Sequence, residues 1–205
     1  MPHWILLSEY VATIENGKSP ATEGRPASDD EWGVLKVGAV SFGSFNEKQN
    51  KALPIAYTPP PSFEVKPGDF LMSRANTREL VGACTMVRKT RPKLMLSDKI
   101  FRLVFRQPLM ALPEYLEQVL KSPALREQIE RKASGTSPTM KNISKAKVLS
   151  LLLPPIMLSE QKKIVAELDA FQTEVDTLKR LQSKTATELD ALLPAILDRA
   201  FKGEL

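Results

Sequence analysis

The spacing of apolar residues divides the chain into two parts of different character. Up to about residue 112, short apolar runs alternate with turns rich in proline and glycine, a pattern typical of short strands. The runs with strand character are Trp32–Gly38, Asp69–Ser73, Leu80–Val87 and Lys99–Phe105. In the last run Ile100 and Arg102 share one face, and Phe101, Leu103 and Phe105 share the other. The pattern predicts a small twisted sheet.

Two segments of this part are predicted to lie outside the sheet. Gly17–Asp30 is rich in proline, serine and glycine and has the composition of a surface loop. Tyr57–Ser62 contains consecutive prolines, and because proline donates no hydrogen bond to a ladder, the segment cannot be a central strand.

Helical spacing begins at Pro113 and continues to Ala133. Ser122 and Pro123 are placed as the N-cap and first residue of a second helix. A polar loop, Ala133–Thr139, and an apolar run that we expect to be buried, Val148–Leu153, follow. We therefore predict an α+β domain over residues 1–157, with a short twisted β-sheet and helices.

The remaining residues, 158–205, predict one long helix with a coiled-coil seam. Ser159 is a suitable N-cap, and no glycine or proline interrupts residues 160–193, so the helix should be about 50 Å long. Apolar residues then recur at alternating steps of four and three, which is a heptad pattern. The residues of this seam are Ile164, Leu168, Phe171, Val175, Leu178, Leu189, Leu192 and Ile196, with the polar Gln182 and Thr185 in the same register.

A domain of this size cannot easily cover such a seam along its whole length, so we expect a second copy to do so. Two antiparallel helices that cross near Gln182 and Thr185, or somewhat nearer their N-termini, would form a homodimer with polar residues that set the register. The dimerisation residues would be Ile164, Leu168, Phe171, Val175, Leu178, Leu189 and Leu192. The alternative is a helix that folds back over its own domain.

The net positive charge of the chain suggests a polyanionic ligand. The 205 residues carry a net charge of +5 with a pI near 9.3, and 42% of them are hydrophobic, which excludes wholesale disorder. Residues 1–150 hold an excess of +7, whereas residues 151–205 hold −2. A polyanion such as DNA would therefore bind the first part.

Few residues suit catalysis or metal binding. One cysteine, Cys84, and one histidine, His3, cannot build a zinc site, and Cys84 lies in an apolar stretch that favours burial. No phosphate-binding glycine motif and no methyl-donor motif is present, and Asp29–Glu31 has the character of a solvated acidic cluster. We expect a binding protein without cofactor or metal, not an enzyme.

The N-terminus also lacks the basic region and cleavage site of a signal peptide, and no run is long enough to span a membrane. We expect the chain to be cytoplasmic.

Three polar segments suit DNA recognition, which needs cations near phosphates and amide or guanidinium groups near base edges. They are Asn46–Lys51, Ser73–Arg78 and Ser134–Lys141. Arg74 or Arg78 could instead form a salt bridge with Glu79, and the basic run Arg88–Lys93 could serve only solubility. The candidate DNA-binding residues are Lys48, Lys51, Arg74, Asn76, Thr77, Arg78, Thr136 and Lys141.

Several stretches, in this order, resemble the DNA specificity subunit of type I restriction–modification systems. Two of these stretches are the more specific. The first is the junction formed by Leu153-Pro-Pro-Ile156 and Ser159–Ile164, and the second is the closing segment Ala200–Leu205. The looser motifs are Trp4–Gly17 with Trp32–Gly38, Pro67–Ala75 with Val81-Gly82, and Ser134–Thr136 with Met140–Ile143.

The resemblance implies a target-recognition domain over residues 1–157 and a spacer helix over 158–205. Such subunits carry two of each, with the helices antiparallel, so this chain resembles a half-length form, natural or truncated. The family has no catalytic residues of its own and positions methyltransferase and restriction subunits on a bipartite target in double-stranded DNA. Its recognition domains touch DNA through loops, which assigns that role here to Arg74, Asn76, Thr77, Arg78, Thr136 and Lys141.

Two other functions remain open. The chain could be a coiled-coil adaptor or scaffold without sequence-specific DNA binding, or the detached recognition domain of a fused DNA methyltransferase. The missing methyl-donor motif and the ending at Leu205, which has the appearance of a complete terminus, disfavour the second of these.

Overall fold

The computed structural model describes residues 4–108, 110–137 and 140–203. The chain forms two compact units that divide between Gln161 and Lys162. The first unit is a mixed domain of sheets and helices, and the second consists of the greater part of a single helix. The predicted α+β class, with a long C-terminal helix, is confirmed.

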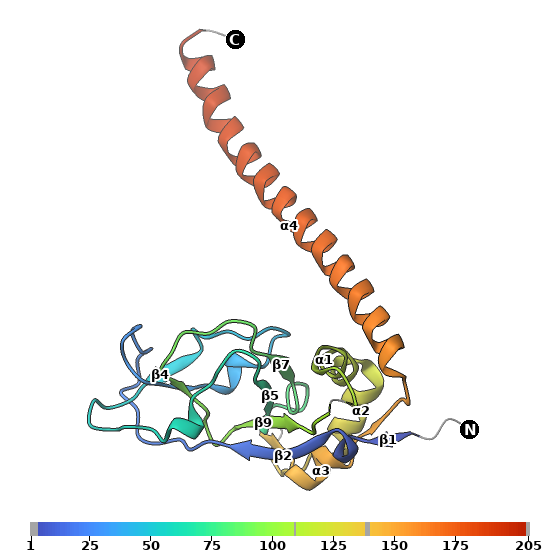
Figure 1. Cartoon of the computed structure of the whole chain (residues 1–205). Helices are drawn as coiled ribbons and strands as arrows, with labels where there is room; N and C mark the ends of the chain where they lie inside the picture. Colours follow the sequence, from blue (N-terminus) through green and yellow to red (C-terminus); the bar gives the residue numbers. More distant parts are fainter. Residues whose placement is uncertain (1–3, 109, 138–139, 204–205) are drawn as a thin grey trace. The chain divides into compact units, whose positions relative to one another are not determined.

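The larger sheet of the domain has the order β2–β9–β5–β7, with every neighbour antiparallel (Figure 1). Its strands are β2 (Val11–Asn16), β5 (Phe70–Ser73), β7 (Cys84–Met86) and β9 (Ile100–Phe105). Both faces of β9 are covered, since Ile100, Phe101 and Leu103 are all buried. The polar exception is Arg102, whose guanidinium pairs with Glu15 at 3.1 Å and Asp69 at 2.8 Å.

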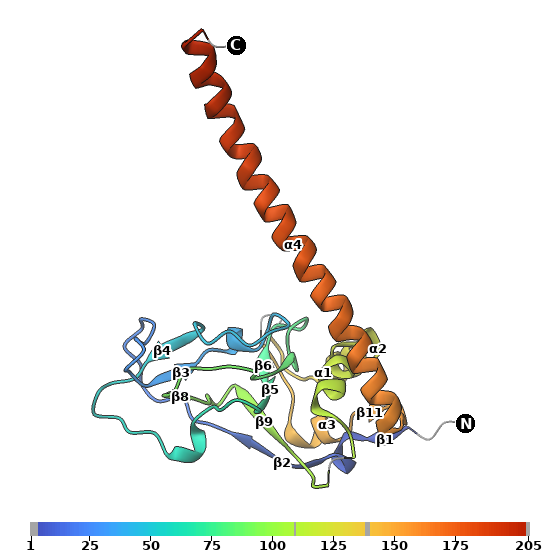
Figure 2. The same cartoon turned by 45° about the horizontal axis from the view of Figure 1, so that its top comes forward.

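A second sheet, of order β4–β3–β8, shares its core with the first (Figure 2). Strand β3 (Gly33–Leu35) is antiparallel to β4 (Asn50–Ala52) and parallel to β8 (Leu94–Met95). The shared core contains side chains from both sheets and the turns between them, namely Leu35, Ala39, Val40, Val65, Leu71, Val87, Leu94, Leu96 and Ile100.

Two short antiparallel pairs join segments that are distant in sequence. Strand β1 (Ile5–Leu6) pairs with β11 (Leu152–Leu153), and β6 (Ala75–Asn76) pairs with β10 (Lys141–Asn142). The short 3-10 turns are η1 (Leu7–Glu9), η2 (Val37–Ala39) and η3 (Pro61–Phe63).

The helices of the domain follow the predicted proline signals. Helix α1 (Pro113–Lys121) packs against β7, and α2 (Pro123–Lys132) begins after Ser122, which has extended backbone angles at the N-cap position. Among the described residues, the Ser122 hydroxyl accepts no capping hydrogen bond. Helix α3 (Lys145–Leu149) is capped by the Ser144 hydroxyl, which accepts a hydrogen bond from the Lys147 N–H at 3.3 Å.

Two of the strands predicted from sequence were too long. In the predicted run Leu80–Val87, the strand covers Cys84–Met86. A turn precedes it, in which the Leu80 and Val81 N–H groups donate to the Thr77 carbonyl. Gly82 of this turn has a φ of 72°, a backbone conformation that favours glycine. In Trp32–Gly38 the strand ends at Leu35, where the backbone turns into η2.

Helix α4 (Leu158–Phe201) extends beyond residues 160–193, the uninterrupted stretch from which a length of about 50 Å was predicted. Its 44 residues correspond to a length of about 66 Å. The helix continues through Pro194, which has no N–H to donate to the backbone carbonyl one turn earlier. Because Pro194 is exposed, that carbonyl is open to water. The assignment of Ser159 as N-cap was wrong: the Met157 carbonyl already accepts hydrogen bonds from Glu160 and Gln161. Across the part of the chain that the structure describes, no helix is long and apolar enough to cross a membrane.

Candidate DNA interface

The pairing of β6 with β10 brings two of the predicted DNA-binding segments together. Asn76 lies directly opposite Lys141, and Ala75 lies opposite Asn142. The Ile143 N–H also donates to the Arg74 carbonyl at 3.0 Å. Residues 74–78 and 136–141 therefore belong to one surface region of the domain, although Pro138 and Thr139 lie outside the described residues, as does His3.

Several candidate side chains of this region already bond to the protein. The Asn76 amide nitrogen donates to the Ser41 hydroxyl at 2.9 Å, and its oxygen accepts from the Thr77 N–H at 2.9 Å. The Lys141 ammonium donates to the Gly135 carbonyl at 2.6 Å. DNA would have to replace these bonds, or use the groups through their remaining lone pairs and hydrogens.

The two arginines of this region differ in their partners. Arg78 forms an ion pair with Glu130 at 3.1 Å, so the alternative of a salt bridge with Glu79 was wrong. The pKa of Glu79 is lowered by a hydrogen bond from the backbone N–H of Glu79 itself and by one from the Thr77 hydroxyl. The nearby charge of Arg78 lowers this pKa further. Arg74 is exposed and donates to the main-chain carbonyl of Asp98 at 3.2 Å. Among the described residues, no carboxylate forms an ion pair with Arg74.

The other candidates are exposed residues. Thr136 is in a bend, Lys48 is in a turn, and Lys51 lies within β4 opposite Val34. No ion pair of the described residues involves Lys48 or Lys51.

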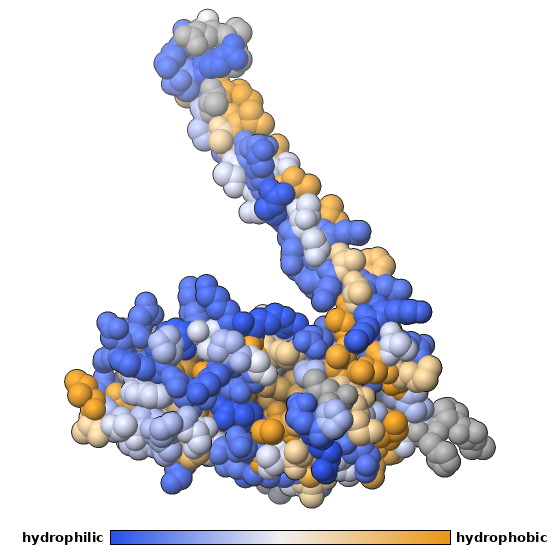
Figure 3. Space-filling view, viewed as in Figure 1, coloured by the Kyte–Doolittle hydropathy of each residue, from blue (hydrophilic) through white to orange (hydrophobic). Residues whose placement is uncertain are grey.

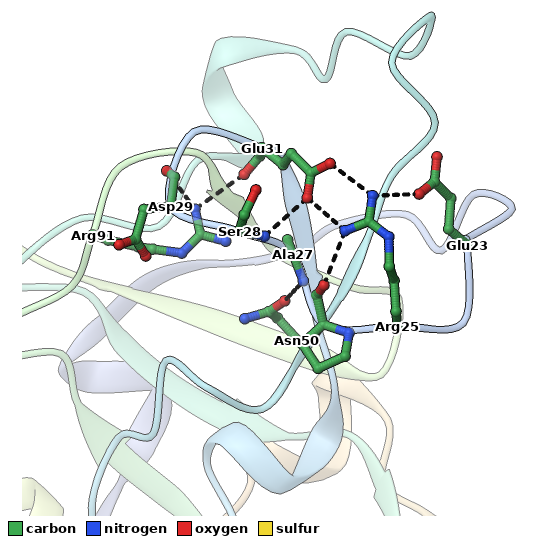
Figure 4. A network of polar contacts seen from close by, with 9 residues as sticks. Glu23, Arg25, Ala27, Ser28, Asp29, Glu31, Asn50 and Arg91 are labelled. Carbon is green, nitrogen blue, oxygen red and sulfur yellow. Dashed lines mark hydrogen bonds and ion pairs between the residues drawn. The ribbon is translucent and has the colours of Figure 1, made fainter.

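The basic run Arg88–Lys93 is largely used to hold the domain together. Arg88 pairs with the buried Glu117 at 3.0 Å. Arg91 donates to the carbonyls of Asp29 and Glu31 (Figure 4). Lys93 donates to the carbonyl of Asp30. The run is therefore a poor candidate for DNA contact.

The acidic cluster Asp29–Glu31 is likewise structural. Arg25 lies between Glu23 and Glu31 with distances of 2.6 and 2.7 Å (Figure 4). The Arg25 side chain and the Ser28 N–H bond to the Glu31 carboxylate and hold its pKa well below its usual range. Among the described residues, no group of three or more His, Cys, Asp or Glu could hold a metal ion.

Cys84 is buried, as its apolar surroundings predicted. Burial raises the pKa of its thiol to about 12, so the reactive thiolate is not available near neutral pH.

Sequence reasoning missed two lysines that the fold brings next to Lys51. Lys36 follows β3, Lys99 precedes β9, and all three line one surface cavity of about 380 Å³. No local signal could have grouped residues from three separate segments.

The helix α4 carries the predicted apolar seam on its surface. Figure 3 shows apolar side chains in orange spaced along the helix between polar ones in blue. Leu168, Phe171 and Val175 are 39%, 63% and 42% exposed, and Leu178, Leu189 and Leu192 are 59%, 60% and 52% exposed. Ile164 is half-buried.

Comparison with known proteins identifies relatives along almost the whole chain. It is 36% identical over 203 residues to the type I restriction enzyme EcoEI specificity subunit of Escherichia coli, a match that covers 95% of this chain and 34% of the relative. It is 30% identical over 176 residues to the type I restriction enzyme EcoKI specificity subunit of Escherichia coli strain K12, covering 84% of this chain and 37% of the relative. No family model matches.

Solved structures agree with these relatives. A chain from a study of complex assembly and conformational transition of the type I R-M system superposes with a TM-score of 0.62 at 26% identity, over 99% of this chain and 46% of that one. The type I restriction–modification S subunit from M. genitalium has the same fold, with a TM-score of 0.57 at 16% identity, over 88% of this chain and 42% of that one.

The chain spans about a third of the length of the curated relatives that it matches. By sequence and by fold, it is a relative of the type I restriction–modification specificity subunits and corresponds to one part of such a subunit.

Proposed function

We propose that the chain is a non-catalytic, sequence-specific DNA-binding subunit of a type I restriction–modification complex, and that it directs methyltransferase and restriction subunits to a bipartite DNA target. The observation that carries this proposal is the 36% identity to a specificity subunit over 95% of the chain, which includes both the mixed domain and the helix. Residues 1–157 would be the target-recognition domain and residues 158–205 the spacer and dimerisation helix. DNA as the ligand would place the chain in the cytoplasm.

Within the domain, the proposed reading surface is the region joined by β6 and β10. Arg74 is its strongest member, because its guanidinium is exposed, pairs with no carboxylate in the described part of the chain, and can approach a guanine edge. Lys48, Lys51 and Thr136 are exposed and would contact phosphates. Asn76, Thr77, Arg78 and Lys141 would support this surface, since each already bonds to the protein.

Helix α4 would pair with the same helix of a second copy. Its exposed seam has a strict heptad spacing, and the chain corresponds to less than half of its structural relatives. An antiparallel homodimeric coiled coil would bury the seam and place two recognition domains at opposite ends of a rod of about 66 Å. The target would then be an inverted repeat with a fixed spacer that neither domain reads.

Salt-dependent binding separates this function from a coiled-coil scaffold. A protein that neutralises several phosphates loses affinity steeply as salt rises, with a slope of about −0.9 per phosphate in a double-logarithmic plot. We expect a steep slope for the full chain, measured by fluorescence anisotropy on duplex DNA with and without a type I methyltransferase subunit. Absence of DNA binding in both conditions would instead support the scaffold.

A further inference from the structure

A basic cavity of the domain lies at the junction of the two sheets. It has a volume of about 380 Å³, and its walls come from the loop after β2, from β3 with η2, from β4 and from the turn before β9. Its polar lining consists of Ser19, Thr22, Lys36, Lys51, Ser97 and Lys99. No carboxylate is among the described residues that line it.

The three lysines of the cavity stand out by their lack of partners. Lys36, Lys51 and Lys99 are exposed, and within residues 4–108, 110–137 and 140–203 no ion pair or side-chain hydrogen bond is formed by their ammonium groups. By contrast, Arg25 and Arg102 each pair with two carboxylates. Like charges around one hollow repel one another, so an anion that enters it is favoured.

The walls of the cavity are fixed by the surrounding fold. The backbone of β3 pairs with β4, which places Lys51 opposite Val34, and the Lys36 N–H donates to the Gln49 carbonyl at 2.9 Å. The loop that carries Ser19 and Thr22 leads directly into the network of Figure 4, where the Ala27 N–H donates to the Asn50 side chain at 2.9 Å. The lysines therefore project from a rigid frame.

Two further groups bear on what the cavity would hold. The Ser97 hydroxyl is buried and has no hydrogen-bond partner among the residues that the structure describes, which leaves a polar atom in the cavity wall unsatisfied. The Asp98 carboxylate accepts a hydrogen bond from the Ser19 hydroxyl, so one negative charge lies near the three positive ones. The local balance remains positive.

One wall of the cavity, the turn that carries Lys99, is bonded to Arg74 of the proposed reading surface. The Arg74 N–H donates to the Lys99 carbonyl at 2.8 Å, and the Arg74 guanidinium donates to the Asp98 carbonyl at 3.2 Å. A polymer whose base edge meets Arg74 would thus place its backbone within reach of Lys99.

We propose that this cavity binds a phosphodiester of the DNA backbone through Lys36, Lys51 and Lys99. The inference rests on the proposed function and names the site that fixes the duplex on the domain. Lysine acts as a point charge toward phosphate and carries no base preference, so the contact would contribute affinity and not sequence choice. The exposed, flexible ammonium groups suit a phosphate presented by a duplex, whereas free phosphate is usually held by backbone N–H groups and arginine.

The test compares two triple variants of the full chain. Lys36→Gln, Lys51→Gln and Lys99→Gln together remove the charge of the cavity and keep the side-chain stems; Lys66→Gln, Lys89→Gln and Lys163→Gln remove the same charge from exposed positions outside it. We expect the cavity variant to bind specific and random duplexes more weakly by the same factor, with a salt slope smaller by roughly one to three. The control variant should keep a slope closer to that of the wild type, and both should keep the wild-type melting temperature.

A series of duplexes with single methylphosphonate substitutions tests the contact itself. One neutral phosphate should weaken wild-type binding and leave the cavity variant unaffected, since the partner is already missing. Two results would refute the cavity as a DNA site and leave the proposed function intact. In the first, both triple variants lose the same DNA affinity; in the second, the cavity variant loses affinity for inorganic phosphate but not for DNA. A wild-type chain that binds no DNA, even with a methyltransferase subunit, would overturn both.

Discussion

Asn76 lies directly opposite Lys141 across the antiparallel pair formed by β6 and β10. The Asn76 amide also donates to the Ser41 hydroxyl at 2.9 Å, so the backbone and side chain of this one residue together link three segments that are far apart in sequence. The surface that would meet DNA is therefore held by the same bonds that close the domain, and recognition and stability should be coupled there.

Asn76→Ala should lower the free energy of unfolding by about 1–2 kcal/mol, because it removes two hydrogen bonds of a half-buried amide. Urea denaturation would measure this change. Unchanged stability together with loss of preference at a single adenine would show instead that Asn76 reads a base.

Arg74→Ala should weaken binding to the specific site by about 1–3 kcal/mol and leave folding intact, since the side chain is exposed and no described carboxylate pairs with it. Arg78→Ala should have a smaller effect, because that guanidinium is paired with Glu130. Arg131→Ala is a matched control, as Arg131 is exposed and forms an ion pair with Glu127 on its own helix. Equal affinities for all three variants would move the reading surface toward Lys48 and Lys51.

Glu117→Gln should destabilise the domain by about 1.5–3 kcal/mol near neutral pH. The buried carboxylate accepts hydrogen bonds from Thr85, Met86, Arg88 and Lys121. Burial alone would raise the pKa of Glu117, but the hydrogen bond and charge of Lys121, together with Arg88, outweigh it and lower the pKa.

The sign of the pH dependence follows from that lowered pKa. The contribution of Glu117 to stability is complete above the unfolded pKa of about 4.3 and is lost as the pH falls through the lower folded value. Melting temperatures of wild type and variant should therefore converge in acid. A difference that stays constant down to about pH 2 would refute the role of this charge.

Leu168→Glu with Val175→Glu should convert a dimer into monomers that bind a half-site weakly, because the changes place charges in the apolar seam of α4. Ala170→Glu with Thr177→Glu adds the same charge outside the seam and should leave the dimer intact. Sedimentation velocity at micromolar concentration measures both. A wild-type chain that sediments as a monomer would defeat the dimer.

The parts of the fold that were predictable from sequence are those with a local cause. The heptad spacing of α4 and the proline starts of α1 and α2 depend on neighbours within a few residues, and the structure has these helices where the pattern predicted them. The turn before β7 was missed because Gly82 had to be recognised as a left-handed residue inside an apolar run.

The contacts of the candidate site were less predictable because they join distant residues. The ion pair of Arg78 with Glu130 and the gathering of Lys36, Lys51 and Lys99 depend on how sheets and helices meet. The sequence could indicate which residue types suit DNA, but not which of them the fold would pair internally. Five of the eight candidate side chains turned out to bond within the protein, namely Arg74, Asn76, Thr77, Arg78 and Lys141.

We propose that this chain selects the DNA sequence on which a type I complex acts. The most direct test of this proposal is to co-express the chain with a type I methyltransferase subunit and to sequence the modified bases across the host genome. We predict methylation at one defined inverted repeat with a fixed spacer, and a loss of that pattern in the Arg74→Ala variant. Methylation without a common motif, or a motif that does not depend on the chain, would contradict the claim.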